Sequence, residues 1–335
     1  MVENEAPQLS AGEAELYDRQ IRLWGLESQK RLRAARILLV GLNGLGAEVA
    51  KNIILAGIKA ITLMDDRNVT PEDSASQFLC STQDVGQNRA EASLQRARAL
   101  NPNVEITADN SKVETKTDEF FESFDVVCVI EQTIDVLINI NNICRKLDIK
   151  FLCGDVWGMF GYTFGDLKNH EYAEDVITYK TEKSLYGKSK SITVTTTKKG
   201  YLAFVPLKSV MTRDYKAANF LKSLKRNGPC YLAMRVLHKF RTKFNRDPLP
   251  STKEEDIKEL NTIRKLILSE TGIEESLFTE DFFSHVVLQI SPTCAILGGI
   301  LGHEIIKAVS QREKPHDNLF FFNPQNCSGF VDCVR

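Results

Sequence analysis

The chain has 335 residues, of which 43% are hydrophobic, enough to bury a large core in one or two domains. Its 43 Lys and Arg residues nearly balance its 44 Asp and Glu residues, which excludes a chain-wide field that would attract nucleic acid or an anionic membrane. The N-terminus lacks the apolar segment of a signal peptide and no run of membrane-spanning length follows, so we expect a soluble intracellular protein.

Strands and helices alternate in the first half of the chain. The apolar run at residues 36–41 predicts a strand buried on both faces, the spacing of apolar residues over 44–56 predicts a helix, and 60–65 predicts a second strand. The pattern continues with a helix at 88–100, strands at 104–108 and 125–130, a helix at 134–147 and a strand at 150–154. This order predicts an α/β fold with a doubly wound, mainly parallel sheet and right-handed crossovers.

The composition divides the chain into four parts. Residues 1–165 form the N-terminal part of the α/β unit, and residues 166–200, rich in Lys, Thr and Ser, are predicted as a flexible crossover. Helical periodicity dominates residues 201–290, which predicts a helical insertion. Residues 291–335 are predicted to return to the α/β unit.

The predicted return begins with a helix at residues 291–310. We expect Gly298, Gly299 and Gly302 to let another element approach this helix closely, because glycine has no side chain. The helix is also expected to pack tightly on the sheet. Late strands are predicted at residues 318–323 and 329–333.

Eight cysteines and five histidines are scattered without the spacing of a disulfide framework or a zinc site. Apolar neighbours surround Cys128, Cys144, Cys153 and Cys294, which favours core packing over nucleophilic chemistry. We therefore predict reduced thiols and no metal site.

A glycine-rich turn, Gly41-Leu-Asn-Gly44-Leu-Gly46, joins the first predicted strand and helix. Such a turn presents backbone N–H groups to phosphate, and Asp65, about 20 residues further on, is placed to bind a ribose. The dinucleotide fingerprint, however, requires glycine where Asn43 stands. The sequence leaves open whether the turn binds a nucleotide or serves only tight turning and helix–strand packing.

The segment Tyr17-Asp-Arg-Gln-Ile-Arg-Leu-Trp-Gly25 resembles the opening of the ubiquitin-like-activating enzymes. The glycine turn with residues 47–52, then residues 77–79 and 85–90, continue this resemblance in order. The resemblance implies a Rossmann-like adenylation fold of the MoeB and ThiF type. Members of this family pair two related adenylation halves, of which one retains the ATP chemistry and the other is a structural partner.

Further segments resemble the smaller, non-catalytic subunits of heterodimeric SUMO activators: residues 154–156, 161–164, 240–248 and 298–322. The resemblance implies that a catalytic partner carries out ATP-dependent adenylation and thioester transfer of SUMO. The chain would then be an enzyme only as part of the heterodimer, with the partner and SUMO as its contacts and no nucleic acid or membrane. ATP and Mg would be bound mainly by the partner, and the expected location is nuclear, with a cytoplasmic fraction as the alternative.

Departures from the active half's pattern indicate which half this chain is. By alignment to that pattern, Arg67 replaces the second acid of an Asp-x-Asp motif, Ser76 replaces a phosphate-stabilising arginine, and Arg89 replaces a lysine. Gln132 stands at the metal-binding aspartate and offers no carboxylate to magnesium. In addition, no cysteine lies between Cys153 and Cys230, where the thioester-forming residue would be expected.

Arg19 is the strongest functional candidate in the chain. The resemblance implies that this arginine acts in trans, as an arginine finger on the ATP phosphates bound in the partner, since its donors fit phosphate oxygens bidentately. The alternative is a structural salt bridge, to Glu15 or to Asp18 of a neighbour. Arg22, three residues further on, is a weaker candidate for phosphate binding. The alternative is that its side chain is simply exposed to solvent.

Three other functions remain in competition. An activator subunit for a sister modifier shares the Tyr17–Gly25 motif, and a nicotinamide-dependent oxidoreductase shares the strand, glycine and acid pattern. A self-sufficient adenylating homodimer would need a working ATP site, which Arg67, Ser76 and Gln132 argue against. Asn43 and the long N-terminal motif argue against the oxidoreductase.

Overall fold

The computed structural model describes residues 9–183, 189–213, 215 and 217–334. A mixed sheet of eight strands lies at its centre: β1 (Arg36–Val40), β2 (Ala60–Met64), β3 (Glu105–Asp109), β4 (Val126–Ile130), β5 (Lys150–Trp157), β6 (Phe160–Asp166), β9 (Leu319–Asn323) and β10 (Ser328–Asp332). The spatial order is β10-β9-β6-β5-β4-β1-β2-β3. The strands from β3 to β5 in this order are parallel, and the pairs β5–β6, β6–β9 and β9–β10 are antiparallel. The predicted α/β fold with a mainly parallel sheet is therefore confirmed.

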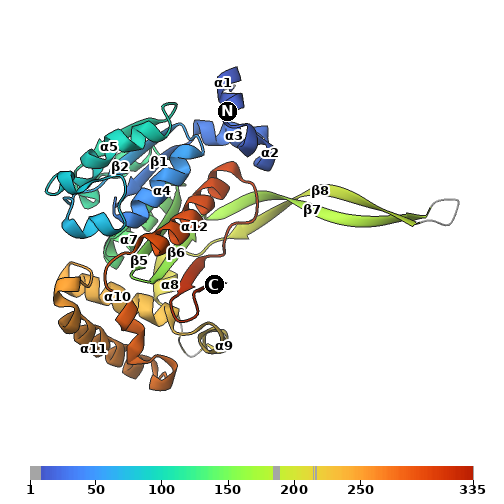
Figure 1. The fold of residues 1–335 in the computed structure, drawn as a ribbon. Coiled ribbons are helices and arrows are strands. Elements are labelled where there is room, and N and C mark those ends of the chain that lie inside the picture. Colours follow the sequence, from blue (N-terminus) through green and yellow to red (C-terminus); the bar gives the residue numbers. More distant parts are fainter. Residues whose placement is uncertain (1–8, 184–188, 214, 216, 335) are drawn as a thin grey trace.

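Helices cover both faces of the sheet (Figure 1). One face packs against α3 (Leu26–Ala34), α4 (Gly44–Leu55), α5 (Arg89–Leu100) and α12 (Ser291–Ser310). The other packs against α6 (Asp118–Phe121), α7 (Ile134–Leu147), α8 (Leu207–Met211), α9 (Ala218–Asn227), α10 (Cys230–Phe244) and α11 (Lys253–Thr271). Alternate residues of the central strands enter the two layers, as Leu38 and Leu39 of β1 do. Because both faces are covered, these strands are continuously apolar.

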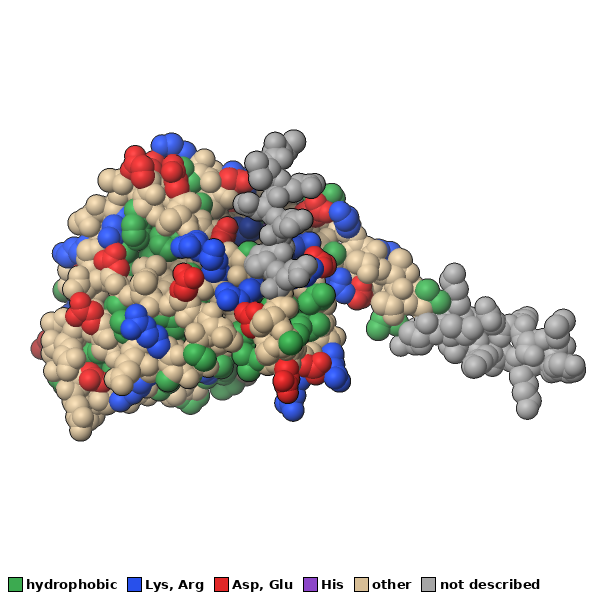
Figure 2. Space-filling view, turned by 90° about the horizontal axis from the view of Figure 1, so that it is seen from above, with side chains coloured by type: hydrophobic (Ala, Val, Ile, Leu, Met, Phe, Trp, Pro, Cys, Tyr) green, Lys and Arg blue, Asp and Glu red, His purple; other side chains and the backbone are tan. Residues whose placement is uncertain are grey.

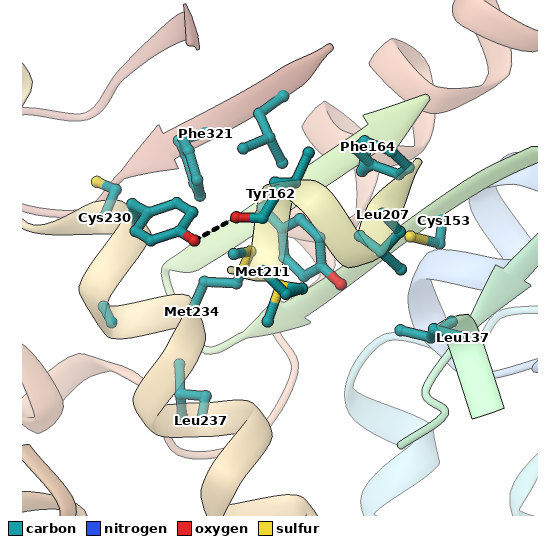
Figure 3. Packing of buried hydrophobic residues seen from close by; sticks show 14 of the residues in the cluster. Leu137, Cys153, Tyr162, Phe164, Leu207, Met211, Cys230, Met234, Leu237 and Phe321 are labelled. Carbon is teal, nitrogen blue, oxygen red and sulfur yellow. Dashed lines mark hydrogen bonds between the residues drawn. The ribbon is translucent and has the colours of Figure 1, made fainter. Parts of the chain in front are cut away.

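The helical insertion shares a hydrophobic core with the sheet. Figure 3 shows Met234 and Leu237 of α10 in the same buried cluster as Tyr162 of β6 and Phe321 of β9. The Tyr162 hydroxyl lies 2.8 Å from Nε2 of His238, also on α10. The insertion is thus part of the α/β body. The sequence reasoning did not predict β6, the strand that makes these contacts.

Residues 166–200, expected to be a flexible crossover, instead contain most of a long antiparallel hairpin. Its strands β7 (Asn169–Lys183) and β8 (Ser189–Ala203) pair along their whole length and project from the body (Figure 1). Around the hairpin base, the backbone N–H of Ala173 donates to the carbonyl of Gln311. Among the ribbon's described side chains, only His170, Tyr172 and Leu202, near the body, are buried. The expectation was wrong because a projecting ribbon needs few apolar residues, so its composition stays polar, whereas its Thr, Val and Ile residues favour strands.

Helix α12 packs closely on α4. A Cβ on Gly298 would lie 2.4 Å from the Cβ of Glu48, and one on Gly302 would lie 2.9 Å from the Cβ of Asn52, whereas Gly299 faces open space. The expected close approach of another element is therefore confirmed at Gly298 and Gly302, where that element is α4, and is wrong for Gly299. The expected packing of this helix on the sheet is also confirmed, at β5 and β6. By length and composition α12 is apolar enough to cross a membrane, but its burial against α4 and β5 explains that composition in a core helix.

These contacts predict opposite effects for two neighbouring substitutions. Gly298→Ala should lower the free energy of unfolding by about 1–3 kcal/mol, because the added methyl group would overlap Glu48. Gly299→Ala is the matched control and should raise it by roughly 0.5–1 kcal/mol, because alanine loses less entropy than glycine in a helix. Urea denaturation of both variants measures the difference, and equal stabilities would contradict the close packing of α4 and α12.

Candidate functional site

The glycine turn after β1 is shaped by packing. Gly41 has a φ of 92°, and a Cβ there would lie 2.4 Å from the carbonyl oxygen of Ile130. A Cβ on Gly46 would lie 2.0 Å from the carbonyl oxygen of Gly41. Asn43 caps α4, its Oδ1 accepting a hydrogen bond of 3.1 Å from the backbone N–H of Gly46. The glycines therefore have structural roles, and one N–H that could have faced a phosphate is already bonded.

Ser76 fills the space at the start of α4. A Cβ on Gly44 would lie 2.2 Å from the Ser76 hydroxyl oxygen and 3.0 Å from the Cys294 sulfur. Ser76 follows a short 3₁₀ helix, Pro71–Ala75, and is buried. A side chain thus stands where a phosphate would approach the helix N-terminus.

Asp65, expected to face a ribose, is used by the chain itself. Its Oδ2 accepts a 2.7 Å hydrogen bond from the N–H of Leu42, and its Oδ1 accepts a 2.9 Å bond from the N–H of Arg67. Burial raises the pKa of Asp65 to about 6, although the Arg89 charge opposes this shift. Asp65 fastens the end of β2 to the glycine turn.

Arg67 and Arg89 close on one carboxylate. Arg67 Nη1 lies 2.5 Å from Oε1 of Glu131, and Arg89 Nη1 lies 2.9 Å from Oε2 of the same residue. Arg89 also pairs with Asp73 at 3.0 Å and approaches Asp65 to 3.7 Å. Burial by itself would raise the pKa of Glu131, but the two guanidinium groups lower it below its usual value. The two arginines that replace catalytic-type residues therefore neutralise the acids around them.

The neighbouring cavity has a volume of about 370 Å³, and several of its lining residues are paired with one another. Its wall includes Asn43, Arg67, Asp73, Ser76, Arg89 and Glu131. Each of the two guanidinium groups is already paired with a carboxylate, so neither is free to bind phosphate. The backbone carbonyl of Gln132 accepts a hydrogen bond from Arg241. The amide side chain of Gln132 is uncharged and so offers no carboxylate to a metal ion.

Sequence reasoning did not identify a second set of buried charges beside this cavity. Asp155 of β5 accepts two hydrogen bonds of 2.9 Å from Arg241 of α10, and the same guanidinium donates twice to Asp247 at 2.8 Å. The N–H of Glu131 donates to Asp155, and the Trp157 indole N–H donates to Asp247. The only signal was the segment 240–248, quoted for its family resemblance, which contains both Arg241 and Asp247.

The four cysteines expected in the core, Cys128, Cys144, Cys153 and Cys294, are all buried. Burial raises the pKa of the thiols of Cys128, Cys144, Cys230 and Cys294. Cys80 and Cys153 are also buried, and only Cys327 and Cys333 are exposed. In the described part of the chain, no group of three or more His, Cys, Asp or Glu residues is arranged to hold a metal ion.

The N-terminal motif anchors one face of helix α2 (Asp18–Trp24), which follows α1 (Ala11–Leu16). Tyr17 is buried over Gly57, and its hydroxyl accepts a hydrogen bond from Asn101. Gln20 donates to the Leu55 carbonyl, and the Trp24 indole donates to Gln29. These anchors hold α2 against the C-terminal end of α4.

Arg19 projects from the opposite face of α2. Its side chain is exposed and makes no hydrogen bond or ion pair within residues 9–183, 189–213, 215 and 217–334, so the alternative bridge to Glu15 is not formed. Arg22 pairs instead with Asp18 at 3.0 Å and remains exposed. The exposed residues Leu16, Leu23 and Leu26 lie close in sequence to Arg19, with Leu23 72% exposed. Figure 2, which looks down on this end, shows charges of both signs interspersed over the visible face.

Arg19 and the glycine turn lie at opposite ends of α4. Gln20 contacts Leu55 at the last residue of the helix, whereas Gly44 begins it. Twelve helical residues span about 18 Å. Arg19 therefore does not reach the nucleotide-type turn of its own chain, and a phosphate bound by it would have to belong to another molecule.

Comparison with known proteins finds one family model and several close relatives. The model described as the ThiF family matches residues 17–333. A protein named SUMO-activating enzyme subunit 1 from Xenopus laevis is 47% identical over 341 residues, covering 100% of this chain and 99% of the relative. The proteins of the same name from Homo sapiens and Danio rerio are 46% and 44% identical, covering 97% and 99% of this chain and 96% and 97% of the relatives.

The ion-pair network predicts a large effect of Arg89→Ala. Removal of this buried guanidinium should cost about 3–5 kcal/mol of unfolding free energy at pH 7, because Asp73 and Glu131 would lose a buried counter-charge. Arg67→Ala should cost less, because that side chain is partly exposed.

The deficit of Arg89→Ala should also depend on pH. Without the cation, the folded-state pKa of Asp65 rises further above its unfolded value, and the pKa of Glu131 rises from its lowered position, so the folded variant binds more protons than the folded unmodified chain. The stability deficit of the variant relative to the unmodified chain therefore shrinks as the pH falls from 7 toward 5. Urea denaturation at both pH values measures this, and a pH-independent deficit would contradict the role of Arg89 as counter-ion.

Proposed function

The chain belongs to the ThiF family, and from this membership we propose that it is the non-catalytic subunit of a heterodimeric SUMO-activating enzyme. The catalytic partner would join ATP to SUMO and carry out thioester transfer, while this chain completes and supports the partner's site. The activating-enzyme role is supported by the relatives named SUMO-activating enzyme subunit 1, which match over nearly the full length of both chains.

One observation carries the non-catalytic assignment: the ion pairs of Glu131 with Arg67 and Arg89. They occupy the guanidinium groups that could otherwise bind phosphate, while Ser76 covers the start of α4. ATP and Mg would therefore be bound by the partner, at the equivalent site in its own adenylation half. We also propose a nuclear location, in keeping with a role in SUMO conjugation.

Arg19 would act on the partner's ATP. The anchored face of α2 holds the helix on the body, which leaves the exposed guanidinium without competing partners among the described residues. The nearby exposed leucines would be covered by the partner subunit on assembly. In that contact the fork of Arg19 would donate to phosphate oxygens and stabilise charge during adenylation. Arg22 would remain with Asp18 and contribute little.

The competing functions have less support. The names of the relatives favour SUMO over a sister modifier. For a nicotinamide-dependent oxidoreductase, the Asn43 cap and the Ser76 hydroxyl stand where a pyrophosphate would approach the backbone. A self-sufficient adenylating homodimer would need a phosphate site that is not filled by its own ion pairs.

ATP–pyrophosphate exchange with SUMO tests this proposal directly. We expect exchange only when the chain is co-purified with a catalytic subunit, because its own site is closed. Exchange by the isolated chain would show that its ion pairs can break to admit ATP and that the subunit is itself catalytic. Absence of exchange in both samples, with a sister modifier active in the mixture, would move the assignment to that modifier.

Arg19→Ala should lower exchange by the assembled heterodimer by roughly a thousand-fold, the usual contribution of an arginine finger. Arg19→Lys should recover only part of this, because lysine keeps the charge but loses the bidentate fork. Arg96→Ala, an exposed arginine on α5, is the matched control and should leave the rate unchanged. Size-exclusion chromatography verifies assembly, and full activity of assembled Arg19→Ala would remove the proposed trans role.

A further inference from the structure

A groove of about 520 Å³ opens among helices α7, α10 and α11, on the side of the sheet opposite α12. Ile134 and Ile138 of α7 contribute one apolar side, and Ile263 and Leu266 of α11 contribute another. In Figure 1, α10 lies between these two helices. The side chain of Leu266 is 56% exposed, a large value for a leucine beside other apolar residues. The volume is typical of binding pockets, which span roughly 300–1,000 Å³.

The apolar residues are spaced for contact with a helix. Ile134 and Ile138 are four residues apart, and Ile263 and Leu266 are three apart, so each pair forms a ridge on its own helix. Every lining residue lies on a helix, so the groove offers no strand edge to which an extended peptide could add. An amphipathic helix with apolar residues at matching intervals is therefore the partner structure that fits.

The charges of the groove come mainly from α10. Arg235, Lys239 and Lys243 recur every four residues along it, facing a single lining carboxylate, Glu259. Lys243 pairs with Glu259 at 2.6 Å, and Lys239 pairs with Glu270 at the rim at 3.3 Å.

Arg235 differs from the two lysines. It donates to the Met211 carbonyl and the Tyr215 hydroxyl, both uncharged, and pairs with no carboxylate in the described part of the chain. Burial lowers the pKa of His238 well below its usual range, so this lining residue adds no charge at pH 7. Among the described residues, the Arg235 end of the groove therefore carries a positive charge that no carboxylate neutralises.

We propose that this groove docks an amphipathic helix of a protein other than the catalytic subunit, with leucine-type side chains between α7 and α11 and a carboxylate on Arg235. The contact assigned to the catalytic subunit surrounds Arg19 on α2, and in Figure 1 that helix lies at the other end of the molecule from α10 and α11. The apolar ridges provide the affinity, and the Arg235 guanidinium, which pairs with no carboxylate among the described residues, selects an acidic partner. This docking function goes beyond the activation of SUMO.

Two fluorescent peptides test the docking site on the full-length chain. One is an 18-residue designed helix with leucines at three- and four-residue intervals and glutamates beside them, and the other carries lysine in place of each glutamate. We expect saturable binding of the acidic peptide by fluorescence anisotropy, with binding of the basic peptide at least about ten-fold weaker. Methyl resonances of Ile134, Ile138 and Ile263 should shift on binding. Absence of saturable binding, or equal binding of the two peptides, would overturn the proposal.

Matched variants locate the binding. Leu266→Asp should weaken the acidic peptide at least about ten-fold, whereas Leu55→Asp, an exposed leucine on α4, should not. Arg235→Gln should abolish the preference for the acidic peptide while Lys146→Gln, an exposed charge on α7, preserves it. Thermal melts of all four variants identify any variant that fails to fold. If one does, the methyl shifts of the unmodified chain show where the peptide binds.

The assembled heterodimer provides the last arm of the test. Peptide binding that persists after assembly supports a groove open to a further protein. Loss of binding on assembly would mean that the catalytic subunit covers the groove, which would overturn the proposed occupant without affecting the adenylation assay.

Discussion

The carboxylate of Glu131, held between Arg67 and Arg89, is the interaction on which the centre of the molecule depends. It sits just after β4, where the parallel strands end and where a nucleotide would bind in an α/β fold. A buried ion pair is not intrinsically better than apolar packing, but loss of one partner is costly because a buried charge is left behind. The network thus holds the loops after β2 and β4 together while its carboxylates are ionised. The same ion pairs occupy the guanidinium groups that would bind phosphate.

The same network joins the two parts of the fold. The backbone N–H of Glu131 donates to Asp155, and Asp155 in turn holds Arg241 of the helical insertion. Together with the apolar contacts of α10 on β6 and β9, this makes the insertion part of the α/β body. The two ends of helix α4 have different roles. Ser76 fills the space at its start, whereas its last residue supports α2 and the exposed Arg19. A subunit can therefore lose its own chemistry and still present a group to a neighbour.

Periodicity predicted the interior elements well because burial on one or both faces leaves a direct trace in the sequence. The predicted helices at 134–147 and 291–310 match α7 and α12, and the apolar runs match β1, β2 and β4 closely. Prediction failed where that trace is absent. Residues 166–200 are mostly polar because the ribbon projects from the body and buries, among its described side chains, only those near its base. In β6 the strand itself is continuous, but glycines at 161 and 165 break the apolar pattern of its sequence.

The sequence by itself determined the α/β class, the family resemblance and the departures at Arg67, Ser76, Arg89 and Gln132, because these depend on local pattern and on residue identity. Only the tertiary structure decided what the replacements do. Glu131, Asp155 and Arg241 come from separate elements, and no local pattern reveals that they pair with one another or with Arg67 and Arg89. The placement of Arg19 beyond reach of its own glycine turn is likewise a tertiary fact, set by the length of α4 and by the side of the helix on which α2 docks.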